Sequence, residues 1–189
     1  MKHETSLFEW LESKKLQFIT DIISTIKNTI DTNIIKGSNK NINIINKGVI
    51  TYHYNLEEYK NIFARRAKRF INTIIWSTEL IFVRINPIDN FTSEEEINNF
   101  CEVIHSINST LNIKFLIIHT LKLTDNYKAL DNSKIVNSTL IQREFMFEDC
   151  PDEYLRNNNK IQKQFLNYLE ECGINIELKS NIQFDDKAV

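Results

Sequence analysis

The chain reads GVITYHY at residues 48–54, NLEEYKNIFARRAKRFINTIIW at 55–76 and ELIFVRI at 79–85. The first and last segments are short apolar runs typical of strands, and the middle one has apolar residues every three or four positions, as a helix does. A strand, a helix and a second strand in this order predict two parallel strands joined by a crossover. These strands would carry His53 and Arg84 to their carboxyl ends, where open α/β sheets build binding sites.

Further helices and strands are predicted on both sides of this unit. A helix in two pieces is expected over residues 5–33, and a polar, Asn-rich loop with a short strand at 42–45 is expected over 34–47. The later elements are a helix that begins at Thr92 or Ser93, strands at 114–121, 136–147 and 174–178, and a helix from Pro151 to about Cys172.

This order of elements predicts an α/β fold. We expect a three-layer arrangement, with a mostly parallel sheet, helices on both faces and an N-terminal helical segment. The 189 residues are enough for one domain. Within it, residues 1–47 would form the helical segment and loop, and residues 48–178 the α/β core.

Composition excludes several classes of function. The net charge of −2 gives no drive toward nucleic acid or an anionic membrane, so neither is predicted as a partner. The three glycines (Gly37, Gly48 and Gly173) are too scattered for a P-loop or a dinucleotide-binding fingerprint. We therefore expect no nucleotide cofactor, and the oligomeric state is left open.

The cysteines indicate a reducing compartment. Cys101, Cys150 and Cys172 are too few and too scattered for a disulfide framework or a zinc site, so a cytoplasmic location and no metal are predicted. The sequence begins without a charged and then apolar leader, and it has no apolar run of about 18 residues, so neither secretion nor a membrane span is expected. Cys101 and His105 lie four residues apart on a predicted helix, but two ligands do not make a metal site.

Four short motifs, in order along the chain, are similar to those of one family. They are SLFEWLES (6–13), GVITYHY (48–54), FARRAKRF (63–70) and ELIFVRI (79–85). The chain resembles the DUF1796 family, which is labelled as papain-like cysteine peptidases and has a "PFDW" segment, a strand ending in His, a paired-arginine helix and an "lFvR" strand. The resemblance implies an α/β fold and a site that includes His53 and Arg84. Because the family often accompanies surface-polysaccharide genes, it also implies a glycan, acyl or peptide substrate.

The family's nucleophile has no counterpart in this sequence. Family members carry a Gly-x-x-Cys segment ahead of the "PFDW" motif, whereas this chain has only five residues before SLFEW. The resemblance therefore carries over to the histidine and the arginines, and not to a catalytic cysteine. We expect either a non-catalytic relative or a shortened form of an enzyme.

Three residues are candidates for catalysis. His53 and His119 each end a predicted strand, and such a pair could move protons or bind an anion beside Arg84. Cys150 lies in a turn before a helix, although the surrounding acidic residues would raise its pKa. The alternative for each histidine is a structural role, with its ring nitrogens bonded to backbone groups at the strand end.

Four residues are candidates for ligand binding. Arg84 follows an apolar strand and needs a partner if it is buried, and Asp89 or Asp125 could supply one. Arg65 and Arg66, in the basic helix, could contact an anion. A solvated helix face is the alternative for Arg65, and a carboxylate partner at the margin of the core is the alternative for Arg66.

We expect a catalytically reduced protein that binds an anionic or glycan-like ligand, or a protein partner, in a crevice at the strand ends. One alternative is a hydrolase or transferase that depends on His53 with Cys150 or a water molecule. A second alternative is a protein-interaction module whose contacts come from the N-terminal helix.

Overall fold

The computed structural model describes residues 15–38, 41–45, 47–50, 55–86, 91–119 and 129–144, together with Asn167 and Glu170. The chain divides into two compact units, Met1–Phe145 and Met146–Val189. Every helix and strand whose bounds are given below lies in the first unit.

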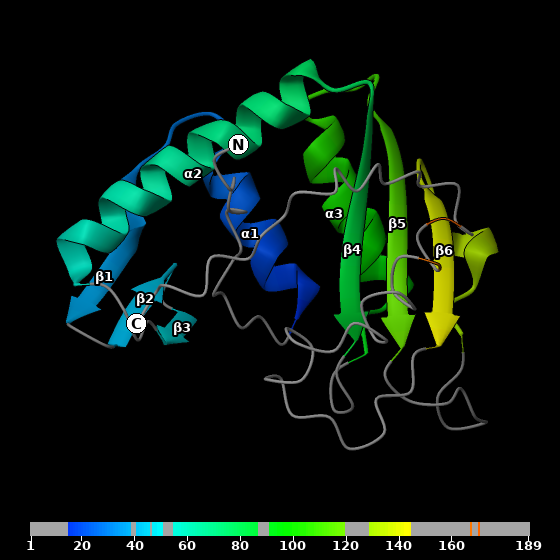
Figure 1. The fold of residues 1–189 in the computed structure, drawn as a ribbon, viewed down its shortest axis with the longest axis horizontal. Coiled ribbons are helices and arrows are strands. Elements are labelled where there is room, and N and C mark those ends of the chain that lie inside the picture. Colours follow the sequence, from blue (N-terminus) through cyan, green and yellow to red (C-terminus); the bar gives the residue numbers. More distant parts are fainter. Residues whose placement is uncertain are drawn as a thin grey trace. The chain divides into compact units, whose positions relative to one another are not determined.

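A parallel sheet forms the part of the fold that carries the candidate site (Figure 1). Its three strands are β4 (Glu79–Asn86), β5 (Asn112–His119) and β6 (Thr139–Glu144), in that order across the sheet. The helix α3 (Glu94–His105) connects β4 to β5, as parallel strands require. The α/β prediction is thus confirmed, and two of these strands lie within two residues of their predicted bounds.

Local sequence explains where α3 begins. The Ser93 hydroxyl accepts a hydrogen bond from the Glu96 backbone N–H at 3.2 Å, and the Glu96 side chain accepts one from the Ser93 N–H at 3.2 Å. This capping box confirms the predicted start of the helix. It satisfies two N–H groups that would otherwise lack partners at the first turn.

The centre of the sheet face that packs on α3 is apolar and includes two phenylalanines that contact Phe100 of the helix. The ring centroid of Phe82 lies 4.8 Å from that of Phe100, and the Phe100 centroid lies 5.5 Å from that of Phe115. These side chains belong to a core that combines α1 (Leu16–Ile26), α3 and the parallel sheet (Figure 1). Its other buried members include Ile97, Ile104, Ile113, Ile117 and Leu140.

The short strands near residue 40 form a second, antiparallel sheet. β1 (Ile35–Ser38) pairs with β2 (Asn41–Ile44), and β2 pairs with β3 (Lys47–Ile50). The short strand predicted at 42–45 corresponds to β2. Two other predictions were wrong: residues 34–47 are not mainly loop, and residues 48–50 are not a parallel neighbour of β4. The physical reason is proximity along the chain, because only two residues separate the end of β2 from the start of β3.

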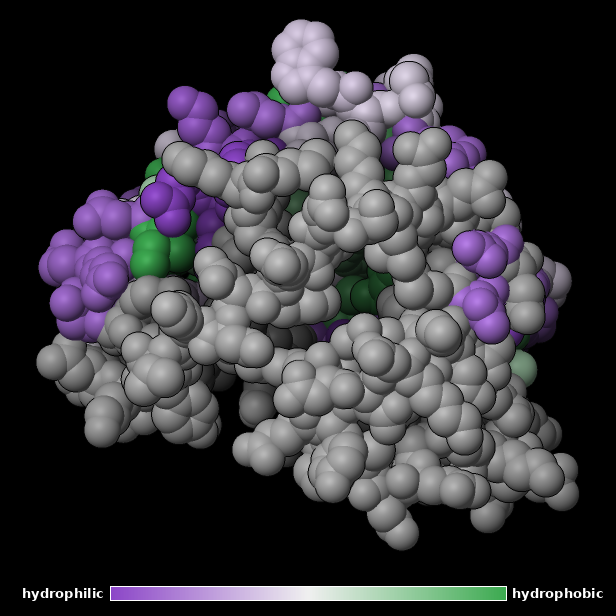
Figure 2. Space-filling view, viewed as in Figure 1, coloured by the Kyte–Doolittle hydropathy of each residue, from purple (hydrophilic) through white to green (hydrophobic). Residues whose placement is uncertain are grey.

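The helix α2 (Leu56–Trp76) begins and is buried much as its sequence predicts. The Asn55 side-chain oxygen accepts from the Glu58 N–H at 2.9 Å, which is the predicted N-cap. Apolar residues at helical spacing, including Tyr59 and Phe63, pack in a second core with α1 and the antiparallel sheet. Hydrophilic residues cover the outer side of α2 (Figure 2).

The helix α1 contributes to both cores. Leu16, Ile19 and Ile23 belong to the core around α3, whereas Phe18 and Ile22 belong to the core under α2. The apolar stripe that the sequence predicts for this helix (Leu7, Leu11, Phe18, Ile22, Ile26 and Ile30) includes Phe18 and Ile22 but none of Leu16, Ile19 and Ile23. Among the helices that the structure describes, none has the length and apolar character that a membrane span requires.

Candidate functional site

Arg84 and His119 lie on the same face of the parallel sheet. In the ladder, Phe82 is opposite Phe115, Arg84 is opposite Ile117, and His119 comes two residues after Ile117. Alternate residues of a strand point to the same face. Since Phe82, Phe115 and Ile117 pack toward α3, Arg84 and His119 also lie on the α3 face, near the carboxyl end of the sheet.

The segment just before α3 orients the Arg84 guanidinium. Arg84 Nε donates a hydrogen bond to Thr92 Oγ1 at 2.6 Å, and Thr92 is buried. Partial burial lowers the pKa of Arg84 from its usual value, and the nearby Glu96 carboxylate partly offsets this. The guanidinium keeps its charge in either case, because arginine is not deprotonated in proteins. A half-buried cation therefore stands beside the first turn of α3.

His119 is held between a ring and an amide. The side chain is 1% exposed, and its ring stacks on Phe91 with 6.5 Å between centroids and 23° between planes. Its Nε2 lies 3.2 Å from Gln142 Oε1. Within the part of the chain that the structure describes, the buried Nδ1 atom has no hydrogen-bond partner. A buried polar atom of this kind is uncommon and is often explained by a function or a missing partner.

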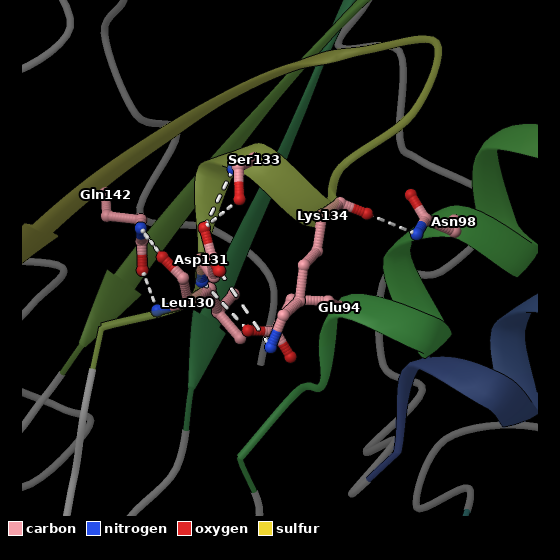
Figure 3. Close-up of polar contacts among 7 residues, drawn as sticks. All are labelled: Glu94, Asn98, Leu130, Asp131, Ser133, Lys134 and Gln142. Carbon is pink, nitrogen blue, oxygen red and sulfur yellow. Dashed lines mark hydrogen bonds and ion pairs between the residues drawn. The ribbon is translucent and has the colours of Figure 1, made fainter.

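Gln142 is itself fixed by the backbone of Leu130 (Figure 3). Its Oε1 accepts from the Leu130 N–H at 2.7 Å, and its Nε2 donates to the Leu130 carbonyl at 2.8 Å. A further bond runs from Gln142 Nε2 to Asn132 Oδ1 at 3.0 Å. Rotating the amide by half a turn would place donor against donor and acceptor against acceptor. The hydrogen bonds to Leu130 therefore fix which amide atom is the oxygen and which is the nitrogen.

The connection before β6 is tied to α3 by polar contacts (Figure 3). Glu94 Oε1 accepts from the Asp131 N–H at 2.8 Å, and Asn98 Nδ2 donates to the Lys134 carbonyl at 2.8 Å. The side chain of Asp131 caps the short helix η2 (Asn132–Lys134) by accepting from Ser133. These bonds hold Leu130, and through it Gln142, in place beside the site.

The Glu94 carboxylate should make the free energy of unfolding depend on pH in the acidic range. The hydrogen bond from the Asp131 N–H holds the pKa of Glu94 below its usual 4.5, so the folded state favours the charged form. That stabilisation is present above the unfolded-state pKa and is lost as the pH falls through the lower folded-state pKa. We expect Glu94→Gln to reduce the free energy of unfolding by about 1 kcal/mol at pH 7, a value reduced for solvent exposure.

Urea unfolding of the Glu94 variant between pH 7 and pH 3 would test this. Glu95→Gln is the matched control, because it removes a charge from the same helical turn at an exposed position. The control should cost less at pH 7, about 0.3–0.5 kcal/mol. Equal losses in the two variants, or a Glu94 effect that does not shrink in acid, would contradict the prediction.

The structure describes four of the seven sequence-predicted site residues. Arg84 and His119 share the α3 face of the sheet, as described above. His53, Cys150 and Asp89 lie outside the described residues, as does Asp125, the second proposed partner of Arg84. The predicted proximity of His53 and Arg84 therefore stays a prediction, because His53 lies outside the described residues.

The two arginines of the basic helix have different surroundings. Arg65 is exposed on α2, while Arg66 is buried, 7% exposed, among the residues that pack under that helix. Burial raises the pKa of Tyr59 to about 12, and the positive charge of Arg66 partly opposes the rise. Arg66 therefore lies beside the second core, near Tyr59.

Sequence reasoning missed Gln142 as part of the site and gave Thr92 only a role at the start of a helix. Gln142 carries no motif, and its position became meaningful only when β6 paired with β5. A weak signal was present in the sequence, because Gln142 is a polar residue two positions after Leu140 and so lies on the same face of the predicted strand.

Cys101 does not have the surroundings of a nucleophile. It is 1% exposed, and burial raises its thiol pKa above the usual value. The place of Cys101 on the apolar side of its helix predicts a small buried hydrophobe, and the structure confirms this. Among the described residues, no three or more His, Cys, Asp or Glu side chains are arranged to hold a metal ion.

No family model matches the chain, and neither a curated protein nor a solved structure is significantly similar to it. The resemblance to the DUF1796 family therefore stays a prediction from the four short motifs.

Proposed function

We propose that this protein binds a small anionic or glycan-like ligand at the carboxyl end of the parallel sheet and does not turn it over. In this proposal it is a catalytically reduced relative of the DUF1796 family. The observation that carries the proposal is the common face of Arg84 and His119, which brings a cation and a buried imidazole to one end of the sheet.

The surroundings of Arg84 favour an anion as the ligand. Thr92 Oγ1 accepts a hydrogen bond from Arg84 Nε and so sets the plane of the guanidinium, whose N–H groups form a rigid fork. Such a fork pairs with carboxylate or phosphate through two parallel hydrogen bonds. The amino-terminal end of α3, which begins directly after Thr92 and Ser93, adds a partial positive charge.

The state of Cys101 supports binding without covalent catalysis. A cysteine nucleophile needs a lowered pKa and access to the substrate, and Cys101, the one cysteine among the described residues, has neither. The hydrolase alternative would depend on His53 and Cys150, which lie outside the described ranges. It remains the alternative that the sequence predicts.

Two further parts of the proposal concern architecture and location. We propose that both faces of the parallel sheet are covered, giving three layers, because Leu116 and Ile118 alternate to the side away from α3 and are only 1% and 3% exposed. We also propose a cytoplasmic location, on the basis of three scattered cysteines.

Removing the charge of Arg84 is the direct test of the proposed ligand site. Titrations with sodium phosphate and with glucuronate, followed by backbone amide NMR shifts, should show binding to the parent protein near the start of α3. Arg84→Gln should weaken this binding roughly tenfold to hundredfold, the usual effect of losing a charge-assisted hydrogen bond.

Lys36→Gln is the matched control, because it removes the same charge from an exposed position on β1. Its titration curves should follow those of the parent. If neither anion binds the parent protein, or if the Lys36 variant loses affinity as much as the Arg84 variant does, the proposed function is wrong.

A further inference from the structure

Gln142 determines which nitrogen of the neutral His119 ring carries the proton. Gln142 Oε1 is an acceptor, because it already takes the Leu130 N–H at 2.7 Å (Figure 3). The His119 nitrogen 3.2 Å away must therefore donate, which places the proton on Nε2. A neutral imidazole has one N–H only, so Nδ1 carries a lone pair.

The Nδ1 lone pair is buried and lacks a partner among the residues that the structure describes. An unsatisfied buried acceptor costs roughly 1–3 kcal/mol, so a chain gains by bringing a donor to it. The ring cannot turn over to avoid this cost without breaking its bond to Gln142, and it also stacks on Phe91. The missing partner of Nδ1 is therefore a hydrogen-bond donor that is not among the groups now in contact with the ring.

We propose that Gln142 is a positioning residue that holds His119 as the Nε2–H tautomer, so that Nδ1 accepts a hydrogen bond from a hydroxyl group of the bound ligand. This inference rests on the proposed function and narrows it. The ligand is an anion that also carries a hydroxyl, such as a sugar acid or a sugar phosphate. Its anionic group pairs with Arg84, and its hydroxyl donates to His119.

Residues 91 and 92 connect the two contacts. Phe91 stacks on the His119 ring, and the next residue, Thr92, accepts from Arg84 Nε at 2.6 Å. The two ligand-binding groups thus adjoin consecutive residues of one short segment. A ligand of a few carbon atoms, with its anionic group and its hydroxyl close together, suits this arrangement.

A pair of probes isolates the hydroxyl. Glycerol 3-phosphate and propyl phosphate have the same phosphate and carbon chain, and they differ in their hydroxyl groups. The parent protein should bind glycerol 3-phosphate about threefold to tenfold more tightly, which is the range expected for one hydrogen bond. In His119→Gln this preference should disappear, because the glutamine amide can still donate to Gln142 but has no atom in place of Nδ1.

The tautomer itself has a spectroscopic signature. Long-range proton–nitrogen correlation spectra distinguish a protonated from an unprotonated ring nitrogen, and the loss of signals in His119→Gln assigns them among the four histidines. The parent should show Nε2 protonated and Nδ1 unprotonated. In Gln142→Leu both tautomers should appear and the hydroxyl preference should fall, whereas Lys36→Gln should keep both properties of the parent.

The failures of the two proposals are distinguishable. If both probes bind the parent equally, the proposed anion site stands and this inference is wrong. If neither probe binds, the proposed function fails, and the inference fails with it. A parent spectrum with the proton on Nδ1 would overturn the role of Gln142 whatever the binding results.

Discussion

Phe100→Ala is expected to lower the free energy of unfolding by about 3–5 kcal/mol, the largest loss we predict for a single substitution. Phe100 is 2% exposed and stands at the centre of the core between α3 and the parallel sheet. Its ring packs edge-on against Phe82 and Phe115, at interplanar angles of 78° and 89°. Truncation leaves a cavity whose aromatic walls belong to two adjacent strands, which cannot close without distorting the sheet.

Equilibrium urea unfolding, followed by circular dichroism, would measure this loss. Trp76→Ala is the control, because it removes a larger aromatic side chain that is 83% exposed at the end of α2. The control should change the free energy of unfolding by no more than about 0.5 kcal/mol. A loss below 1 kcal/mol for the Phe100 variant would mean that α3 does not pack on the sheet through this ring.

Elements defined by local sequence were predictable here. The start of α3 depends on Ser93 and Glu96, and the start of α2 depends on Asn55. Each cap is formed by side chains within three residues of the backbone groups they satisfy, so the sequence contains the whole interaction. The apolar runs of β4 and β5 were equally local signals.

The antiparallel sheet was largely hidden by its composition, and only the strand at 42–45, close to β2, was predicted. Residues 34–47 are rich in Asn and Lys, which favour loops, and the strands there are only four residues long. The relevant signal was the alternation that buries Ile42 and Ile44, both 0% exposed, beneath a polar surface. Two alternating residues are too weak a signal against a polar composition. Such short strands form because they pair with neighbouring strands and pack in the core under α2.

The candidate site was predictable only in part for a similar reason. Arg84 and His119 were found because the polar residue that ends an apolar strand is conspicuous in a sequence. Gln142 and Leu130 were not found, because the bond between them acquires a role only after β6 lies beside β5. The tautomer of a histidine depends on such distant contacts, and no spacing along the chain encodes it.

Asn108 should be the most sensitive polar residue in the described part of the fold. Its Nδ2 donates to the carbonyls of Ile74 and Ser77 at 2.8 and 3.0 Å, at the end of α2, and its Oδ1 accepts from the Thr110 N–H at 3.2 Å. The amide thus joins the last turn of α2 to the turn that leads into β5. We expect Asn108→Ala to lower the free energy of unfolding by about 2 kcal/mol, because it leaves these backbone groups without partners.

Asn108→Asp should be worse than the alanine variant at neutral pH, with a loss of about 3–4 kcal/mol. A carboxylate has no proton to donate, faces carbonyl oxygens, and adds a negative charge at the carboxyl end of α2, where the helix dipole disfavours it. The folded state would therefore raise the pKa of this new carboxyl above the unfolded value of about 3.9. It follows that the excess loss is absent below that value and grows as the pH rises through the folded-state pKa.

Urea unfolding of the two Asn108 variants between pH 3.5 and pH 7 would test this sign directly, since acid effects of other groups cancel in the difference between them. Asn72→Asp is the matched control, because it adds the same charge at an exposed position on α2 and should cost about 0.5 kcal/mol or less. A gap between the aspartate and alanine variants that stays constant with pH would contradict the prediction, because the excess loss would then not come from the carboxylate charge. Closure of the gap in acid would instead show that the ionised carboxylate causes the excess loss of the aspartate variant.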